Sequence, residues 1–223
     1  MEDESMKKNL TELVFIMDRS GSMAGLESDT IGGFNGLIER QKREAGEALV
    51  SVVLFSNESE VIYDREAIES MPQMTERDYC VGGCTALLDA LGGAIHHIGN
   101  IRKYARREDV PAHTLFVITT DGMENASHRY TADQVRRMIT RQKEKYGWEF
   151  LFLGANIDAV QTAARYGIDA DRSVTCCADP AGQQLNYAAL GNVVSDVRAS
   201  REIRSDWKEE IERDLRSHTR RGE

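Results

Sequence analysis

The sequence predicts an α/β fold in which a central, mostly parallel β-sheet is flanked by helices on both faces. Apolar, strand-like runs at residues 10–17, 48–55, 114–119 and 148–153 are separated by segments in which apolar residues recur at helical spacing. The run at 48–55 is apolar at almost every position, which is typical of a strand buried on both faces. Strands that alternate with helices in this way form a parallel sheet with helices on both sides.

Local patterns predict the remaining elements. We expect further strands at 60–63 and 173–176, and helices at 30–45, 86–104, 131–145, 159–166 and 184–198. Asn57 and Glu58 form a turn short enough for a hairpin, so 60–63 is predicted to be an antiparallel edge strand. Thr131 and Gln134 have the spacing of a helix capping box, and Gly167 is placed to end a helix. Residues 64–83 are expected to form a long connection with one short helix.

One domain accounts for most of the chain. We expect a flexible N-terminal segment at 1–9, a single domain at 10–199, and a charged C-terminal tail at 200–223 that is helical or disordered. In the tail, Trp207, Ile211 and Leu215 have helical spacing, which favours a charged helix lying partly on the domain over a partner-binding helix.

Composition excludes several classes of function. The chain has 223 residues, 41% of them hydrophobic, and a net charge of −9, which describes a globular protein without the basic footprint of a non-specific nucleic-acid binder. No apolar run is long enough to span a bilayer, and the acidic N-terminus lacks the features of a signal peptide. We therefore expect a cytoplasmic protein with no nucleic-acid or membrane partner.

The four cysteines do not have the spacing of a disulfide framework. Cys80, Cys84, Cys176 and Cys177 would form a zinc or redox site only if their loops converge, and their spacing does not favour one. Buried thiols are the expected state. Because Cys84 precedes Thr85, oxidation of this thiol is a further hypothesis for disturbing the loop described next.

Three separated segments carry oxygen donors to places where strands or helices should end or begin. Asp18-Arg19-Ser20-Gly21-Ser22 follows the first strand, Gly82-Gly83-Cys84-Thr85 opens a helix, and Thr119-Thr120-Asp121-Gly122 ends a buried strand. Individually these residues are ordinary turn formers and helix caps. Together they form the kind of oxygen-rich shell that binds a small, hard cation such as Mg²⁺.

These segments resemble the metal-ion-dependent adhesion site of the von Willebrand factor A family, and over residues 10–200 the chain is identified as an intracellular, bacterial-type member with a complete motif. The resemblance implies a six-stranded sheet in the order 3-2-1-4-5-6 with an antiparallel third strand. It implies direct metal ligation by Ser20 and Ser22, ligation by Thr85 directly or through water, and a largely water-mediated role for Asp18 and Asp121.

The expected function is therefore divalent-cation-dependent protein binding without catalysis. Mg²⁺ or Mn²⁺ suits these donors better than Ca²⁺, which takes more carboxylate oxygens. The resemblance implies a partner that supplies Glu or Asp to the metal, and a link to ATPases of the AAA+ class. We expect Asp18 and Asp121 on the rim rather than in the core. Asp89, Glu124 and Asn125 are near enough to rim the site, with Glu124 and Asn125 as the rim candidates, although solvated helix or loop positions are the favoured interpretation of all three.

Two other functions remain open from the sequence. A Mg²⁺-dependent phosphoryl-transfer hydrolase could use Asp18 as nucleophile, but Ser20 stands where the general acid of such enzymes would be. The chain also contains neither a phosphate-binding Gly-x-x-x-x-Gly-Lys motif nor a Gly-x-Ser-x-Gly elbow. Alternatively, a self-assembling structural protein could offer Glu209, Glu210 or Glu212 of its tail to a neighbour's metal.

Overall fold

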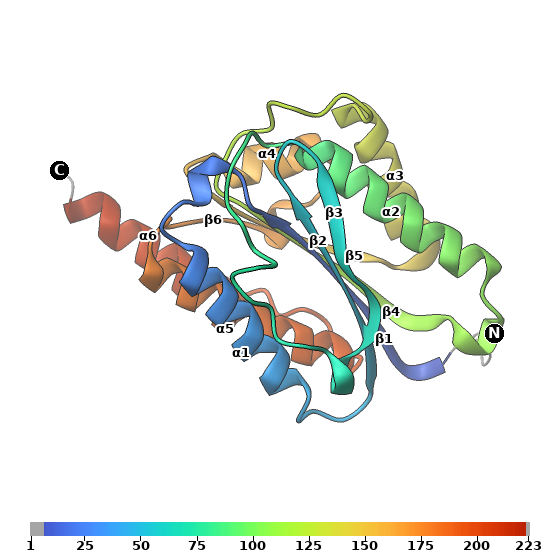
Figure 1. Cartoon of the computed structure of the whole chain (residues 1–223). Helices are drawn as coiled ribbons and strands as arrows, with labels where there is room; N and C mark the ends of the chain where they lie inside the picture. Colours follow the sequence, from blue (N-terminus) through green and yellow to red (C-terminus); the bar gives the residue numbers. More distant parts are fainter. Residues whose placement is uncertain (1–6, 222–223) are drawn as a thin grey trace.

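The computed structural model describes residues 7–221, in which a six-stranded sheet forms the centre of the molecule. Its strand order is β3-β2-β1-β4-β5-β6, as predicted (Figure 1). The β2–β3 pair is antiparallel and all other neighbouring pairs are parallel. The strands are β1 (Lys7–Asp18), β2 (Glu47–Phe55), β3 (Ser59–Ala67), β4 (Pro111–Thr120), β5 (Glu149–Ala155) and β6 (Ser173–Cys176).

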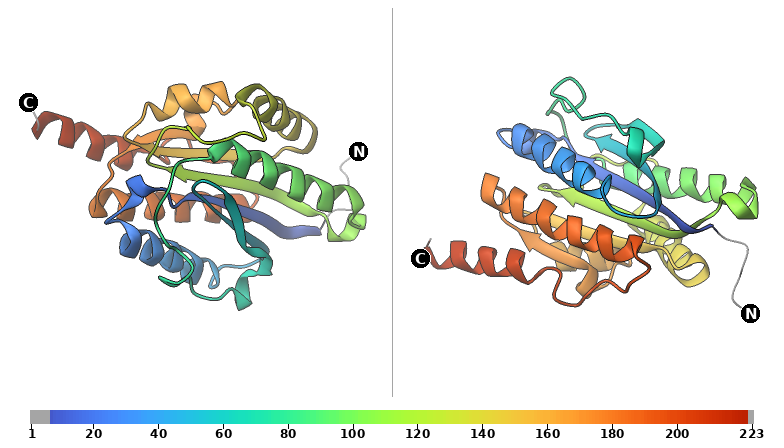
Figure 2. Two further views of the ribbon diagram at one scale, coloured as in Figure 1. Left: turned by 45° about the horizontal axis from the view of Figure 1, so that its top comes forward. Right: turned by 90° about the horizontal axis from the view of Figure 1, so that it is seen from below.

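Helices cover both faces of this sheet, as Figures 1 and 2 show. One face carries α1 (Glu27–Gln41), α5 (Pro180–Arg198) and the start of α6 (Glu209–Arg221). The other carries α2 (Leu87–Tyr104), α3 (Ala132–Tyr146) and α4 (Ala159–Arg165). In β1, Leu13 and Phe15 enter the first core while Val14 and Ile16 enter the second, because successive strand residues point to opposite faces. The α/β prediction is confirmed.

Several boundaries differ from the expected ones for local reasons. α1 spans Glu27–Gln41 instead of 30–45, and the chain turns into β2 through Gly46, whose φ is +92°. β3 continues to Ala67 because its ladder with β2 resumes beyond Tyr63, after irregular register. α5 begins at Pro180 rather than residue 184, where Asp179 accepts a hydrogen bond from the Gly182 amide at 2.7 Å. The expected capping box of Thr131 and Gln134 is present.

The two ends of the chain also have defined structure where it is described. Residues 7–9, expected to be flexible, belong to β1, whereas residues 1–6 lie outside the described residues. In the tail, Trp207 and Ile211 are buried, and the Trp207 indole N–H donates to the Asp171 carbonyl at 2.8 Å. α6 is therefore attached to the domain by its first turns. Among the described residues, no helix has both the length and the apolar character needed to cross a membrane.

Candidate metal centre

The predicted oxygen donors meet at the carboxyl edge of the sheet. Asp18 is the last residue of β1, and Asp121 directly follows Thr120, the last residue of the adjacent parallel strand β4. The chain leaves β1 toward α1 on one face and leaves β4 toward α3 on the other (Figure 1). Ligand sites in open α/β sheets form at such a reversal, because the two departing loops leave a crevice between them.

Hydrogen bonds join the carboxylates and hydroxyls of the first and third motifs. The Ser20 amide donates to Asp18 Oδ1 at 2.7 Å, and the Thr120 hydroxyl donates to Asp18 Oδ2 at 2.5 Å. The Ser22 hydroxyl donates to Asp121 Oδ1 at 2.5 Å and lies 3.0 Å from the Ser20 hydroxyl. Two strand ends that are far apart in sequence thus form one polar network.

The loop before α2 brings Thr85 to the same place. The Gly21 amide donates to the Gly83 carbonyl at 3.0 Å, so backbone hydrogen bonding ties this loop to the first motif. The Thr85 amide donates to Asn125 Oδ1 at 2.9 Å, and the Asn125 amide donates to the Thr85 carbonyl at 3.0 Å. Gly83 has φ +83°, a left-handed conformation that glycine adopts without strain.

Gly122 shows that three hydroxyl groups converge on one point. A methyl group placed on its Cα would lie 3.0 Å from Thr85 Oγ1, 3.2 Å from Ser22 Oγ and 3.9 Å from Ser20 Oγ. The absence of a side chain at Gly122 therefore keeps open the space that these oxygens face. All five residues predicted to form the site (Asp18, Ser20, Ser22, Thr85 and Asp121) contribute to this cluster.

The donor set fits a divalent cation. Asp121 Oδ2 is buried and has no hydrogen-bond partner in the described part of the chain. Neither Asp121 nor Asp18 has an ion-pair partner among the described residues. Two buried carboxylates without a protein cation repel each other, and a bound cation relieves that repulsion. Hydroxyl and carboxylate oxygens without His or Cys are the donors that Mg²⁺ and Mn²⁺ prefer.

Burial dominates the electrostatics of both carboxylates. It raises the pKa of Asp18, and hydrogen bonds from Ser20 and Thr120 only partly oppose this rise. It also raises the pKa of Asp121, where the Ser22 hydrogen bond acts against burial and the Asp18 charge acts with it. Asp18 is 1% exposed and Asp121 3% exposed, so the expectation that they lie on the rim was wrong. The loops that follow β1 and precede α2 cover them.

Access to the cluster is through Ser22, which is exposed, whereas Ser20 and Thr85 are buried. The side chains of the two expected rim residues accept hydrogen bonds from neighbouring backbone amides. Asn125 is exposed beside Thr85, and Glu124 accepts hydrogen bonds from the Leu88 amide at 2.9 Å and from the amides of the 126–127 turn. Both therefore fix the position of the Thr85 loop and the start of α2.

Asp89 differs from its expected solvated state. It is buried, and its carboxylate accepts hydrogen bonds from the backbone amides of His128, Arg129 and Tyr130. Burial acts to raise the pKa of Asp89, but these hydrogen bonds outweigh it, and the pKa is lowered. Asp89 therefore stabilises the loop between β4 and α3, which sequence periodicity alone does not indicate.

Two residues of the site were not predicted. Thr120 donates to Asp18 as described, and its place at the end of a buried strand could have suggested this role. The buried Tyr79 hydroxyl donates to the Asp18 backbone carbonyl from the long loop before α2. No sequence pattern marks Tyr79, because its contact depends on the path of that loop.

The cysteines are all free thiols. Cys176 and Cys177 are buried as expected, whereas Cys80 and Cys84 are exposed, so the expectation of buried thiols was wrong for this pair. In the described residues, Cys80 and Cys84 belong to no cluster of three or more His, Cys, Asp or Glu side chains with metal-binding geometry. The hypothesis that Cys84 oxidation disturbs the Thr85 loop stays a prediction.

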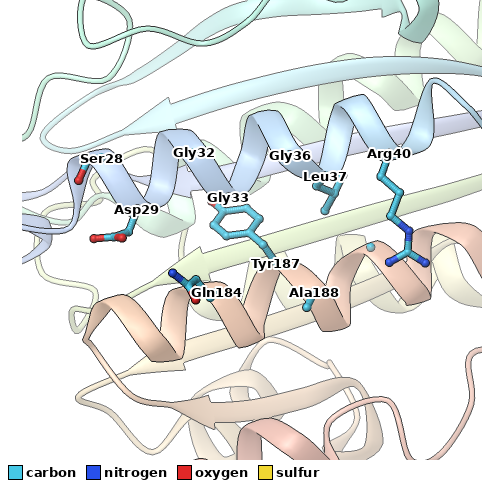
Figure 3. A pocket seen from close by; sticks show the side chains of 11 residues that line it. Ser28, Asp29, Gly32, Gly33, Gly36, Leu37, Arg40, Gln184, Tyr187 and Ala188 are labelled. Carbon is cyan, nitrogen blue, oxygen red and sulfur yellow. The ribbon is translucent and has the colours of Figure 1, made fainter.

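A separate cavity of about 400 Å³ lies between α1 and α5 (Figure 3). Gly32, Gly33 and Gly36 line it opposite Tyr187, and a side chain at Gly33 would overlap the Tyr187 ring. None of the five predicted site residues lines this cavity. Gly33 thus allows α1 and α5 to approach around the Tyr187 ring, which is a packing role.

Comparisons with known proteins agree with this fold. The sequence matches no protein-family model and no curated protein. The structure is similar to a von Willebrand factor type A protein from Catenulispora acidiphila, with a TM-score of 0.55 and 16% identity over 85% of this chain and 43% of the other. It is also similar to the vWF domain of the type V pili tip protein Mfa5 from Porphyromonas gingivalis, with a TM-score of 0.58 and 9% identity over 84% and 95% of the two chains.

A third similar structure is proximal thread matrix protein 1 from the mussel byssus, with a TM-score of 0.58 and 11% identity over 86% of this chain. The present chain covers 46% of that protein, and 43% of the Catenulispora protein. It therefore corresponds to less than half of either one. At these identities the likeness establishes a shared fold, the von Willebrand factor A-like fold.

Proposed function

We propose that this von Willebrand factor A-like domain binds a partner protein through a divalent cation held at the carboxyl edge of its sheet. The observation that carries the proposal is the pair of buried carboxylates, Asp18 and Asp121, which have no cationic partner among the described residues and leave one buried oxygen without a hydrogen bond. The similar structures support the fold alone, so the proposal rests on the chemistry of this site.

Each residue has a defined part in this proposal. Ser20, Ser22 and Thr85 offer hydroxyl oxygens to the cation, which is Mg²⁺ or Mn²⁺. Asp18 and Asp121 supply negative charge, and Asp121 orients the Ser22 hydroxyl by accepting a hydrogen bond from it. When bound, the cation supplies an electrophilic centre that can accept a further oxygen ligand.

The partner ligand is an acidic side chain, Glu or Asp. This chain carries a net charge of −9, so an acidic partner gains no attraction from the domain as a whole. The interaction should therefore depend strictly on the cation, and it should disappear when a chelator is added. The expected cytoplasmic location and the AAA+ partner system stay predictions.

Binding is a better account than catalysis for the same residues. A phosphoryl-transfer enzyme would need a carboxylate oxygen of Asp18 free to attack its substrate. Both oxygens of Asp18 instead accept hydrogen bonds, from the Ser20 amide and the Thr120 hydroxyl, and the side chain is buried. We therefore propose that the site is not an enzyme active site.

The test uses Mn²⁺ as the probe in the full chain after chelator treatment. Calorimetric titration measures Mn²⁺ affinity, and water-proton relaxation reports whether water still occupies coordination positions of the bound ion. A short peptide containing one Glu is then added, with the same peptide carrying Gln as control. Asp18→Asn removes the proposed site, and Asp64→Asn removes an exposed carboxylate on β3 as the matched control.

We expect Mn²⁺ binding in the wild type and Asp64→Asn, and an affinity at least about a hundredfold weaker in Asp18→Asn. The Glu peptide should displace bound water, while the Gln peptide should not. Equal Mn²⁺ affinity in Asp18→Asn and wild type contradicts the metal site. Mn²⁺ binding without any effect of the Glu peptide contradicts the carboxylate-binding mechanism.

A further inference from the structure

A second group of metal-binding side chains lies where α6 crosses the end of β6. Cys177 follows directly after β6, and Asp214 and His218 lie one helical turn apart on α6. One ligand atom of each, the Cys177 sulfur, a carboxylate oxygen and a ring nitrogen, lies within 4.8 Å of the others. Cys177 is buried, Asp214 half-buried and His218 exposed, so the group opens to solvent on one side.

A fourth residue, Asp179, holds the imidazole ring. His218 Nε2 lies 3.2 Å from Asp179 Oδ2. Nδ1 lies 3.4 Å from Asp214 Oδ1 and 3.1 Å from the Asp214 backbone carbonyl oxygen, so a metal bound at Nδ1 replaces this backbone contact. The other oxygen of Asp179 accepts the Gly182 amide hydrogen bond that caps α5. A carboxylate that is fixed by the backbone and reaches one ring nitrogen is the usual arrangement behind a metal-binding histidine.

The surrounding structure fixes this group in place. A side chain at Gly182 would overlap the Cys177 carbonyl oxygen, so the first turn of α5 lies directly against the cysteine. Trp207 and Ile211 anchor α6 one to two turns before Asp214, and both are buried. Figures 1 and 2 show the final part of α6 projecting past the body of the domain. The group therefore lies near the last contact between α6 and the rest of the protein.

The charges around Cys177 are unbalanced. Among the described residues, His218 is the ion-pair partner that both Asp179 and Asp214 share. A carboxylate oxygen of Asp214 and a ring nitrogen of His218 both lie within 4.8 Å of the Cys177 sulfur. A divalent cation in the midst of these groups offsets the negative charge and binds the sulfur as thiolate, with release of the thiol proton.

We propose that Cys177, Asp214 and His218 bind a zinc-class divalent ion that fastens α6 to the turn between β6 and α5, with Asp179 as a positioning residue. Thiolate, imidazole and carboxylate are zinc ligands, whereas Mg²⁺ takes oxygen donors. Tetrahedral zinc sites place ligand atoms about 3.5 Å apart, so a small contraction of the group suffices. The two candidate sites of the molecule thus select different metals.

Cobalt(II) is the probe that distinguishes this proposal from a metal-free cluster in which His218 simply pairs with two carboxylates. Bound cobalt reports a thiolate ligand through a near-ultraviolet charge-transfer band and a tetrahedral site through its visible spectrum. Chelator-treated full chain is titrated with Co²⁺ in the presence of excess Mg²⁺, and Zn²⁺ is then added in competition. Hydrogen exchange of the α6 amides is measured with and without Zn²⁺.

We expect one Co²⁺ with a thiolate band, displaced by Zn²⁺, and slower exchange of α6 amides with Zn²⁺. The exposed His218 allows His218→Gln without loss of the fold, and this variant should bind Zn²⁺ about a hundredfold more weakly. Asp179→Asn keeps the helix cap and should weaken binding about tenfold. The matched controls Cys84→Ser, at an exposed thiol, and Asp18→Asn, at the first site, should retain the band.

Four results would overturn the proposal. Absence of a thiolate band in the wild type means that the group is an ion-pair cluster. A band that persists in Cys177→Ser, or one that is lost in Cys84→Ser, places the metal elsewhere. Equal Zn²⁺ affinity of His218→Gln and wild type removes α6 from the site.

Discussion

Two buried carboxylates on β1 have different surroundings, and the difference separates a structural role from a binding role. Glu12, in the middle of the strand, is 2% exposed, and its two oxygens accept hydrogen bonds from Arg65 Nε at 2.9 and 3.1 Å. Asp18, at the end of the strand, is equally buried but accepts hydrogen bonds only from an amide and a hydroxyl. The next charged group, beyond Ser22, is another carboxylate, that of Asp121. Within residues 7–221 the fold supplies a cation to Glu12 and none to Asp18.

Burying a charge is costly unless a partner offsets it. Burial raises the pKa of Glu12 to about 7 although Arg65 acts to lower it, and burial raises the pKa of Asp18 as well. At Glu12 the rest of the fold compensates for the remaining cost of burying the charge. At Asp18 a cation bound from solution would compensate for it instead.

The largest expected effect follows from removing Arg65, the cationic partner of Glu12. Arg65→Met should lower the free energy of unfolding by about 3 kcal/mol at pH 8, because Glu12 is left buried and charged. At pH 5 the loss should be much smaller, because Glu12 can then be protonated. Denaturant unfolding at the two pH values measures both. An equal loss at both pH values would show that Arg65 acts by packing rather than by charge.

The pH dependence of stability should also report Glu12. Its pKa is about 7 in the folded protein against 4.5 ordinarily, so the folded state binds more protons between these values and stability falls as pH rises. Relative to Glu12→Gln, the wild type should lose about 2 kcal/mol between pH 5 and pH 8. Parallel stability curves of the two proteins would mean that Glu12 has no raised pKa.

A smaller effect is expected at the binding end of the strand. Gly122→Ala places a methyl group 3.0 Å from Thr85 Oγ1 and should weaken Mg²⁺ binding about tenfold. Gly93→Ala in α2 meets no atom within 4 Å and is the matched control, with unchanged Mg²⁺ affinity and stability equal or slightly higher. Calorimetry with Mg²⁺ separates them. Unchanged affinity in Gly122→Ala would place the cation outside the space that the hydroxyls face.

Much of this arrangement is visible in the sequence, because it depends on local patterns. The apolar run at 48–55 and the Asp18–Ser22 motif indicated a buried parallel strand and the end of another. Burial of Asp18 was not predicted, because it arises from a loop that crosses the site and brings Tyr79 to the strand end. The pairing of Glu12 with Arg65 likewise depends on the register of β3, which continues past its expected end.

The group of Cys177, Asp214 and His218 is even harder to predict from the sequence. The sequence directs attention to pairs of cysteines, whereas the structure places Cys177 with Asp214 and His218 of α6. Cys177 is distant in sequence from Asp214 and His218, and its approach to them depends on how Trp207 and Ile211 pack α6 against the domain. Because these residues match no known spacing of metal ligands in sequence, only the tertiary structure reveals the group.

The most direct test of the account is the effect of Mg²⁺ on thermal stability in three proteins. Stability should rise by about 2.7 kcal/mol at a Mg²⁺ concentration a hundred times the dissociation constant, in both wild type and Glu12→Gln. Asp18→Asn should show no such rise, and without metal it should be at least as stable as the wild type, because one of two repelling charges is gone. A rise of equal size in Asp18→Asn, or none in the wild type, would contradict the claim that the uncompensated carboxylates of this sheet edge hold a cation.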